Sequence, residues 1–389
     1  MKFAHLADCH LGGWRQPELD LLNFQSFQKA INQCIKEKID FVLIAGDLFD
    51  SAYPSIDTLK QAFREFRKLQ EAKIPTFVIA GSHDYSLSGK TFLDVLEKSG
   101  FCKNVSIFEE RNGSIVLLPT IYKNVAIYGY PGKKSGLEVD DIERMKLEDA
   151  PGFFKILMLH TTIRSAVPNP RIKSVDDSKL PSVNYLALGH LHINFNKNGK
   201  VYSGPIFPNN LSELEELKHG SFYIFNNGKI ERQELKLKEV FVLNLETNNT
   251  LKATDSIIQL LKNEPIEDKI IILKISGIIE QGRMSDIDFA KIEALAKERK
   301  AFILLKNTSK LQLSEPELQI DAIDTEDIES QIIKKYKESN HSRFNHLISP
   351  LIKILQAEKI YEEKTVVFEQ RLLTETKKVI ENEAQKISS

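Results

Sequence analysis

The chain has 389 residues and a formal net charge of −1 at pH 7, and its composition is 42% hydrophobic and 28% charged. These values are typical of a globular protein with two or three domains, and no apolar run approaches the roughly 20 residues that span a bilayer. Because the net charge is near zero, binding to a polyanion must use local basic patches, metals or a partner rather than bulk charge.

Three cysteines, Cys9, Cys34 and Cys102, lie far apart and form no Cys-x-x-Cys pair. This pattern argues against disulfides and against a structural zinc site, and it favours a reducing compartment. The N-terminus enters an apolar run directly, without a signal peptide. We therefore expect a cytoplasmic protein with no membrane segment.

The first half of the chain alternates short apolar runs with amphipathic segments. Strands are expected at 2–7, 41–45, 76–80, 154–159 and 185–188, and helices at 18–38, 55–71 and 88–99. Alternation of this kind predicts a largely parallel sheet. Shorter strands, at 104–109, 114–119, 125–130, 194–203 and 221–236, are separated by Asn-Gly and similar pairs that indicate tight turns. Residues 1–236 should therefore form one α/β unit with sheets inside and helices outside.

Each of the long apolar strands ends in Asp or His. The side chains concerned are Asp8 and His10, Asp47 and Asp50, His83 and Asp84, His160, and finally His190 and His192. In an extended strand Asp8 and His10 would project together while Cys9 turns away. Ligands of open α/β sheets lie beyond the carboxyl ends of the strands, so these groups should meet. Any one histidine could be a hydrogen-bonded structural residue, but five of the nine lie at these positions.

Carboxylates and imidazoles without thiolates suit Mn²⁺, Fe²⁺ or Zn²⁺ better than Ca²⁺. Six or seven ligands are too many for one ion, so two divalent ions that share a carboxylate are expected. Two metals about 3.5–4 Å apart can hold a phosphate between them and activate a bridging water. The pattern therefore predicts phosphoester chemistry.

The rest of the chain carries no comparable set of polar residues. Residues 237–306 read as β-α-β-α-β, with strands at 240–245, 269–275 and 302–305 and helices at 254–263 and 285–298. Residues 307–329 are rich in Ser, Glu and Asp and read as a linker. Residues 330–389 hold two helices with apolar stripes, which pack either on the main body or on a partner.

Five motifs occur in an order that resembles the calcineurin-like metallophosphoesterases: Asp8-x-His10, Gly46-Asp47-x-x-Asp50, Gly81-Ser82-His83-Asp84, His160 and Gly189-His190-x-His192. The variants Gly-Asp-Leu-Phe-Asp and Gly-His-Leu-His are similar to the SbcD-type branch, the nucleases of double-strand-break repair. The resemblance covers residues 1–236 and implies a sandwich of two mixed β-sheets flanked by helices. Residues 237–306 and 330–389 fit the family's capping domain and ATPase-binding segment by size and order only.

The resemblance also implies roles. Asp8, His10 and His192 would bind one metal, His160 and His190 the other, and Asp47 would bridge. His83, paired with Asp84, would contact the phosphate as general acid or charge stabiliser.

Two positions depart from the family pattern. Ser82 stands where the family usually has a metal-binding Asn, so it could bind directly, bind through water or leave a weaker site. Asp50 stands where many members have histidine, and it could orient substrate or a neighbouring ligand, or be a plain solvated carboxylate.

The implied function is a Mn²⁺-dependent DNA exonuclease and endonuclease that works at the nucleoid with an SMC-like coiled-coil ATPase, docked through the tail from about residue 330. The alternatives are a phosphodiesterase or phosphatase of small molecules, and a DNA-tethering scaffold in which Ser82 has weakened catalysis. The family implies a homodimer through helices, with candidate stripes Leu59, Phe63 and Phe66, and Phe92, Leu93 and Leu96, which core packing explains equally well. Substrate-binding residues are unassigned, although Lys133, Lys134, Arg164, Arg171, Lys173 and Lys197 could follow a DNA backbone.

Overall fold

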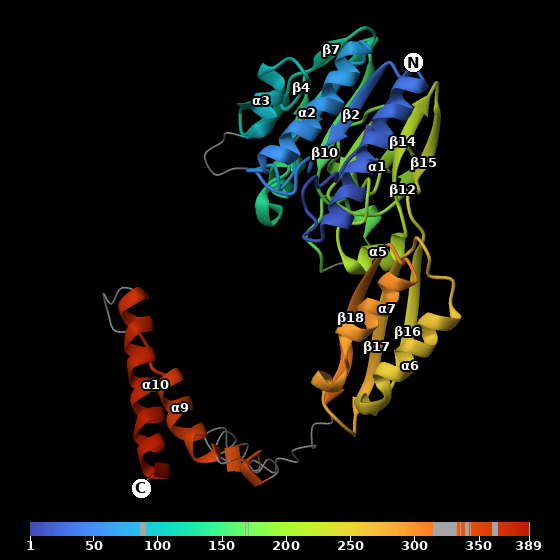
Figure 1. Cartoon of the computed structure of the whole chain (residues 1–389). Helices are drawn as coiled ribbons and strands as arrows, with labels where there is room; N and C mark the ends of the chain where they lie inside the picture. The colour runs from blue at the N-terminus through green and yellow to red at the C-terminus, as the bar shows by residue number, and fades with distance from the viewer. Residues whose placement is uncertain are drawn as a thin grey trace. The chain divides into compact units, whose positions relative to one another are not determined.

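Two six-stranded sheets form the centre of the computed structural model (Figure 1). The first sheet has the order β15 (Lys229–Leu235), β14 (Gly220–Asn226), β1 (Lys2–Leu6), β2 (Phe41–Ala45), β3 (Thr76–Ile79), β4 (Lys103–Asn104). The second has the order β12 (Phe195–Lys197), β13 (Lys200–Tyr202), β11 (Tyr185–Gly189), β10 (Phe154–His160), β8 (Val125–Tyr130), β7 (Thr120–Tyr122). A small third sheet joins β5 (Phe108–Arg111), β6 (Ser114–Leu117) and β9 (Met145–Leu147).

Both large sheets are mixed, which confirms the predicted sandwich. In the first, β1 to β4 run parallel while β14 and β15 run antiparallel to their neighbours. In the second, β8, β10, β11 and β13 are parallel, and β7 and β12 are antiparallel edges. Apolar side chains from facing strands, such as Phe3, Phe41, Ile156 and Tyr185, fill the space between the sheets. The carboxyl ends of the parallel strands therefore open on one edge of the sandwich.

Helices cover the outer face of the first sheet (Figure 1). They are α1 (Pro17–Lys36), α2 (Ile56–Glu71) and α3 (Phe92–Lys98). Pro17 begins α1 at a position where a backbone N–H would have no partner within the helix. The Ser55 hydroxyl caps α2 by accepting from Thr58 N at 3.1 Å. The two stripes predicted for a dimer surface both pack in this core: Phe66, Leu93 and Leu96 are fully buried, and Leu59, Phe63 and Phe92 are partly buried against it.

Several short elements were absent from the prediction. They are α4 (Glu138–Glu143), α5 (Leu211–Leu217), β7 and β9. In addition, the stretch 104–109, expected as one strand, is divided between β4 and β5. The predicted hairpins at Asn198-Gly199 and Asn227-Gly228 are confirmed, since Asn198 and Asn227 have positive φ of 52° and 48°. Such a left-handed backbone matches the twist of a tight two-residue turn.

A second subdomain follows, which we define as residues 240–313. It contains β16 (Val240–Glu246), α6 (Thr250–Asn263), β17 (Ile270–Ile279), α7 (Phe289–Glu298) and β18 (Ile303–Leu313). Its sheet has the order β16-β17-β18. One face of this sheet packs on α6 and α7, and the other shares an apolar cluster with α1 and α5. Residues 307–313, predicted as the start of a linker, thus belong to β18.

The chain divides into two compact parts, Met1–Gln312 and Leu313–Ser389. The structure describes residues 1–85, 91–167, 169, 171–313, 333–334, 336–338, 342, 344–359 and 365–388, so most of the predicted linker lies outside the described residues. The second part contains α9 (Ile348–Leu355) and α10 (Thr365–Ser388), which contact each other. None of the described helices combines the length and apolarity that a bilayer crossing needs.

Candidate metal centre

The loop after β1 carries Asp8 and His10 in a left-handed backbone conformation, with φ of 51° and 42°. The prediction that strand alternation brings them together is therefore wrong in its reason, because the extended backbone ends before Asp8. Instead, Asp8 N donates to Gly46 O at 3.1 Å and His10 N to Asp47 O at 3.0 Å. These bonds hold a conformation that a non-glycine residue adopts only at a cost. Cys9 turns into the core, as expected.

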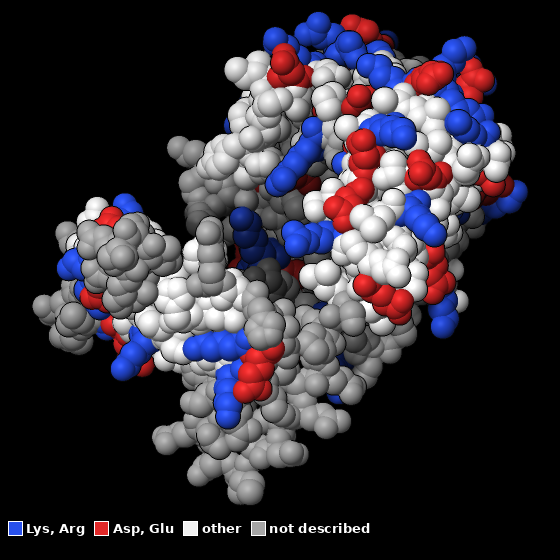
Figure 2. Space-filling model, turned by 60° about the horizontal axis from the view of Figure 1, so that its bottom comes forward, with Lys and Arg blue, Asp and Glu red and all other residues white. Residues whose placement is uncertain are grey.

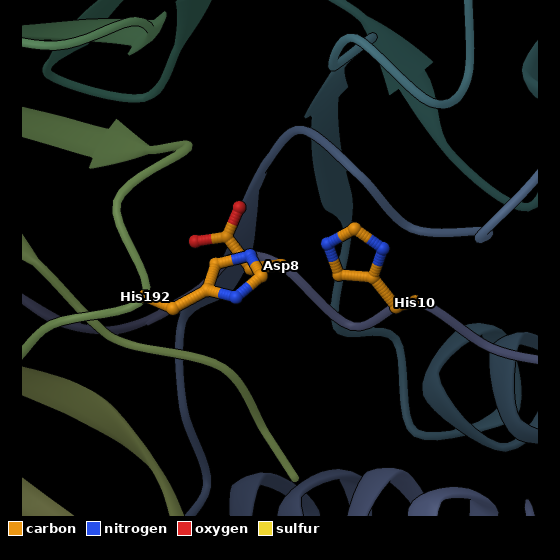
Figure 3. Close-up of side chains that lie close together, drawn as sticks. All are labelled: Asp8, His10 and His192. Atoms are coloured by element: carbon orange, nitrogen blue, oxygen red, sulfur yellow. The ribbon is translucent and has the colours of Figure 1, made fainter. Parts of the chain in front are cut away.

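Asp8, His10 and His192 form the first cluster, with ligand atoms that all lie within 4.8 Å of one another. Figure 3 shows their side chains facing each other, two from the loop after β1 and one from the loop after β11. Asp8 Oδ1 accepts from His190 N at 2.8 Å, which joins the loops of the two sheets. Residues 182 apart in the sequence thus meet at one edge of the sandwich.

Asp47 belongs to a second cluster, which consists of Asp8, Asp47 and His160, and it also approaches His10 of the first cluster. Its Oδ2 is 3.6 Å from His10 Nε2, 3.1 Å from His160 Nε2 and 3.4 Å from the Ser82 hydroxyl. The His190 ring lies beside that of His160, with centroids 5.2 Å apart. One carboxylate therefore touches histidines of both clusters, which is the position that a shared ligand needs.

Two buried ligand atoms support a cation site here. Asp8 Oδ2 and His10 Nε2 have no hydrogen-bond partner among the residues that the structure describes. A buried polar atom without a partner costs about 1–3 kcal/mol, whereas a bound metal satisfies it. Since the donors are carboxylates and imidazoles, the residues present fit divalent ions of the Mn²⁺, Fe²⁺ or Zn²⁺ type.

The Nδ1 atoms of three histidines are held by other groups. His10 Nδ1 lies 3.0 Å from Asp50 Oδ1, His160 Nδ1 3.0 Å from Ala45 O, and His192 Nδ1 2.9 Å from Glu213 Oε1. An acceptor at Nδ1 fixes the tautomer and leaves Nε2 as the atom that could bind a metal. Asp50, whose role the sequence leaves open, thus lies where its carboxylate can orient the His10 ring.

Glu213 is a site residue that the sequence analysis missed, because the helix α5 that carries it is short. One signal was present: Asn210-x-x-Glu213 matches the pattern of a helix start, and Asn210 Oδ1 accepts from Glu213 N at 3.0 Å. That pattern predicts the helix. It does not predict that the carboxylate reaches His192, which depends on the tertiary fold.

His83 pairs with Asp50 and not, as predicted, with Asp84. His83 Nδ1 lies 2.8 Å from Asp50 O and 3.5 Å from Asp50 Oδ1, and its ring is half exposed. The two oxygens of Asp84 accept instead from backbone N–H groups of Leu48, Phe49 and Gly81 at 3.0–3.1 Å. Asp84 is thus a buried carboxylate that ties together the loops after β2 and β3.

His160 and Asp47 shift each other's pKa in opposite directions. Burial alone would lower the pKa of the His160 imidazole, but the charge of Asp47 and its contact with the ring raise it to about 10. Burial would likewise raise the pKa of Asp47, yet the charge of His160 holds it well below its usual range. A divalent cation held by Asp47 and His160 would take the place of the proton on the His160 ring.

Close approach of the loops requires glycine. A side chain on Gly81 would place its Cβ 2.2 Å from Asp47 Oδ1, and one on Gly46, which has φ of +90°, would place it 2.3 Å from His160 Nδ1. Neither distance is possible for real atoms. The glycines in front of Asp47 and Ser82 thus allow the strand ends to converge.

Comparison with known proteins agrees with this geometry. Residues 1–194 match the family described as Calcineurin-like phosphoesterase, a span that contains every predicted ligand. The chain is 28% identical over 287 residues to the DNA double-strand break repair protein Mre11 of Methanocaldococcus jannaschii, which covers 68% of this chain and 75% of that protein. It is 26% identical over 327 residues to the protein of the same name from Sulfolobus acidocaldarius, with 79% and 82% covered.

A bacterial relative is similar over a shorter span. The chain is 31% identical over 209 residues to the uncharacterized metallophosphoesterase YhaO of Bacillus subtilis, which covers 49% of this chain and 48% of that protein. The matched span, the order of the five motifs and the convergence of their side chains agree with one another. Residues 1–194 form a calcineurin-like phosphoesterase domain, and the chain is a metal-dependent phosphodiesterase.

Proposed function

We propose that this protein is a Mn²⁺-dependent DNA exonuclease and endonuclease of double-strand-break repair that hydrolyses phosphodiesters at a two-metal site. The observation that carries the proposal is the convergence of five acidic and imidazole side chains, Asp8, His10, Asp47, His160 and His192. Two of their buried atoms, Asp8 Oδ2 and His10 Nε2, are left without a hydrogen-bond partner among the described residues. The archaeal relatives, whose names specify DNA double-strand break repair, support DNA as the substrate.

In this proposal Asp8, His10 and His192 hold one ion, His160 and His190 hold the other with Ser82, and Asp47 contacts both. A bound pair of such ions holds a phosphate and lowers the pKa of a water. His83 donates from Nδ1 to Asp50 O, which leaves Nε2 as the atom that can contact a phosphate oxygen or the leaving group. Its exposed ring is accessible to a substrate, unlike the buried side chains of Asp8, His10, Asp47 and His160.

We propose that DNA is bound through local contacts, because the net charge is −1 and Figure 2 shows Lys and Arg interspersed with Asp and Glu on the face in view. Two of the basic residues considered from the sequence are neutralised, Lys133 by Asp141 and Lys173 by Asp140. Arg164 and Lys197 line one surface pocket with Lys200, which pairs with Asp177. We propose that this pocket and the capping domain, residues 237–306, guide DNA toward the metal centre.

The experiment that tests the function compares linear double-stranded DNA with a small phosphodiester in Mn²⁺, in Mg²⁺ and in chelator. DNA cleavage that requires Mn²⁺ is expected. His83→Gln should lower turnover by about 10²–10⁴-fold while Mn²⁺ binding is retained, because this residue acts on the substrate and not on the metal. Robust turnover of the small ester alone would instead identify a small-molecule phosphodiesterase.

Exposed apolar side chains on the C-terminal helices support the binding of a partner protein. On α9 and α10 the apolar side chains Leu355, Val367, Leu373 and Ile380 are exposed, which suits an apolar partner surface. We propose that an SMC-like coiled-coil ATPase binds here, inside the cell at the nucleoid. Full-length protein carrying Leu355→Asp and Leu373→Asp should fail to recover the ATPase in a pull-down, and equal recovery would remove these helices from the interface.

We also propose that the protein forms a homodimer. Because the two predicted stripes pack in the core, a dimer must use other residues of the chain. Sedimentation of the purified protein tests this directly, and a mass of one chain at micromolar concentration would exclude the dimer.

A further inference from the structure

The short helix α5 contacts both the metal centre and the second subdomain. Three consecutive residues make these contacts: Glu213 faces His192, Leu214 is fully buried in an apolar cluster, and Glu215 forms an ion pair with Lys274 of β17. Successive residues of a helix point about 100° apart, so one turn can serve two neighbours. Figure 1 shows α5 at the junction between the two sheets of the sandwich and the β16–β18 sheet.

Toward the metal centre, the Glu213 carboxylate is held firmly at the beginning of α5. Oε1 accepts from His192 Nδ1 at 2.9 Å and from Asn210 Nδ2 at 2.6 Å, and Oε2 accepts from Asn209 N at 2.9 Å. The carboxylate therefore cannot move independently of the helix. Because Glu213 Oε1 is the acceptor for His192 Nδ1, the orientation of the imidazole depends on the position of α5.

Away from the metal centre, α5 rests on the second subdomain. Leu214 shares its cluster with Leu19 and Leu22 of α1 and with Val240, Ile270, Ile272 and Leu305 of the β16–β18 sheet. Along β17 the side chains alternate, so Ile272 faces this cluster whereas Ile271 faces the separate core under α6 and α7. The position of α5 thus depends on one face of that sheet.

We propose that α5 couples the second subdomain to the metal centre: Glu213 is a positioning residue for His192, and the β16–β18 sheet positions α5. This inference rests on the proposed two-metal function. Groups that hydrogen-bond a metal-ligating histidine typically change metal affinity by about 10–100-fold when removed. The second subdomain would then act on the affinity of the site as well as on the path of the substrate.

The first test measures Mn²⁺ binding to the full chain by titration calorimetry, with no substrate present. Glu213→Ala should lower the Mn²⁺ affinity of one of the two sites, the one that includes His192, by about 10–100-fold. Glu213→Gln should lower this affinity less, because glutamine keeps an acceptor for the Nδ1 proton. Glu216→Gln is the matched control, since Glu216 is an exposed carboxylate on the same helix. Equal binding by Glu213→Ala and wild type would overturn the inference.

The second test distinguishes an effect on the position of α5 from a general loss of stability of the protein. It compares substitutions at two neighbouring residues of β17. Ile271 and Ile272 are both fully buried, so replacing either with alanine removes the same atoms and should lower the melting temperature in chelator comparably. Only Ile272→Ala should weaken Mn²⁺ binding, by about two- to thirtyfold. If the alanine variants do not fold, the valine pair Ile271→Val and Ile272→Val replaces them. Equal Mn²⁺ affinity of the two variants in the pair would overturn the coupling to the second subdomain.

The outcomes distinguish the inference from the function on which it rests. A wild-type chain that binds no Mn²⁺ would overturn the proposed two-metal function itself. A wild-type chain that binds Mn²⁺ and cleaves DNA, with unchanged binding in the Glu213 and Ile272 variants, would leave the function intact and remove only the coupling through α5.

Discussion

Ser82 is the residue at which the predicted ligand set departs from its family. Its hydroxyl lies 3.4 Å from Asp47 Oδ2, so the side chain points toward the second cluster but is shorter than the usual asparagine. Ser82→Asn would supply an amide oxygen as a ligand and should raise Mn²⁺ affinity by about tenfold. Calorimetry of the variant beside wild type measures this, and unchanged affinity would show that Ser82 already serves as an adequate ligand.

The same variant decides between catalyst and scaffold. A wild-type protein that cleaves DNA well would refute the scaffold alternative. A large gain of nuclease activity in Ser82→Asn would support it, because the gain would show that the natural residue limits catalysis.

His5 is a buried histidine outside the metal centre. It is fully buried on β1, its Nδ1 lies 3.1 Å from the Tyr185 hydroxyl, and burial lowers its pKa from 6.5 to about 3. The unfolded chain therefore binds a proton between these values that the folded chain does not. Stability contributed by the neutral ring is complete above pH 6.5 and is lost as the pH falls toward 3, by up to about 1.4 kcal/mol per pH unit.

His5→Gln should accordingly flatten the loss of stability with acid. Urea midpoints of the chelated protein between pH 7 and pH 5 measure the effect, since the slope and not the absolute stability is compared. A variant that loses stability with acid as steeply as wild type would contradict the assignment.

At the residue scale the sequence predicted which side chains would come together, because their types and positions carry the information. Asp and His at the ends of apolar strands are local signals, and the parallel sheet brings them to one edge. The left-handed backbone at Asp8 and His10 could not be predicted, because it is set by hydrogen bonds to Gly46 and Asp47 from another strand. The contact of Glu213 with His192 depends on the same kind of long-range packing.

Among the elements, the loop after β3 is the one most constrained by the site. A Cβ on Gly81 would lie 2.2 Å from Asp47 Oδ1 and 2.3 Å from Asp47 N, so Gly81→Ala must push the two loops apart. The expected result is a loss of about 1–3 kcal/mol in unfolding free energy and weaker Mn²⁺ binding. Melting curves and calorimetry measure both.

A matched control exists in the hairpin between β5 and β6. Gly113 has φ of +74°, a Cβ added to it would meet no atom within 4 Å, and asparagine tolerates that backbone. Gly113→Asn should change stability by no more than about 0.5 kcal/mol. Similar losses in both variants would mean that Gly81 is not under special steric constraint.

The elements that the sequence predicted well are those with strong local signals. The Asn-Gly hairpins and the amphipathic helices α1 and α2 are of this kind. The end of β18 was read as linker because Asn307, Thr308 and Ser309 are polar, and only pairing within the sheet makes this stretch a strand. The short helices α4 and α5 were missed because six or seven residues carry little periodicity.

At the scale of the whole molecule, the metal centre joins the two sheets of the sandwich. Asp8, His10 and Asp47 follow strands of the first sheet, whereas His160 ends a strand of the second sheet and His192 follows one. The sequence predicted two mixed sheets from the family resemblance, since strand order across two sheets is not encoded in local periodicity. Because ligands from both sheets must come together, metal binding should stabilise the sandwich as a unit.

Mn²⁺ should therefore raise the melting temperature of the chelated protein. At a free concentration of 100 times the dissociation constant, a ligand bound only by the folded state adds about 2.7 kcal/mol to the unfolding free energy. Asp47→Asn removes the carboxylate that touches His10 and His160, so its metal-dependent rise should be much smaller than that of wild type. Glu216→Asn, an exposed change on α5, should keep the full rise. If Mn²⁺ shifts the melting of Asp47→Asn as far as that of wild type, Asp47 does not hold metal, and the two clusters are not one site.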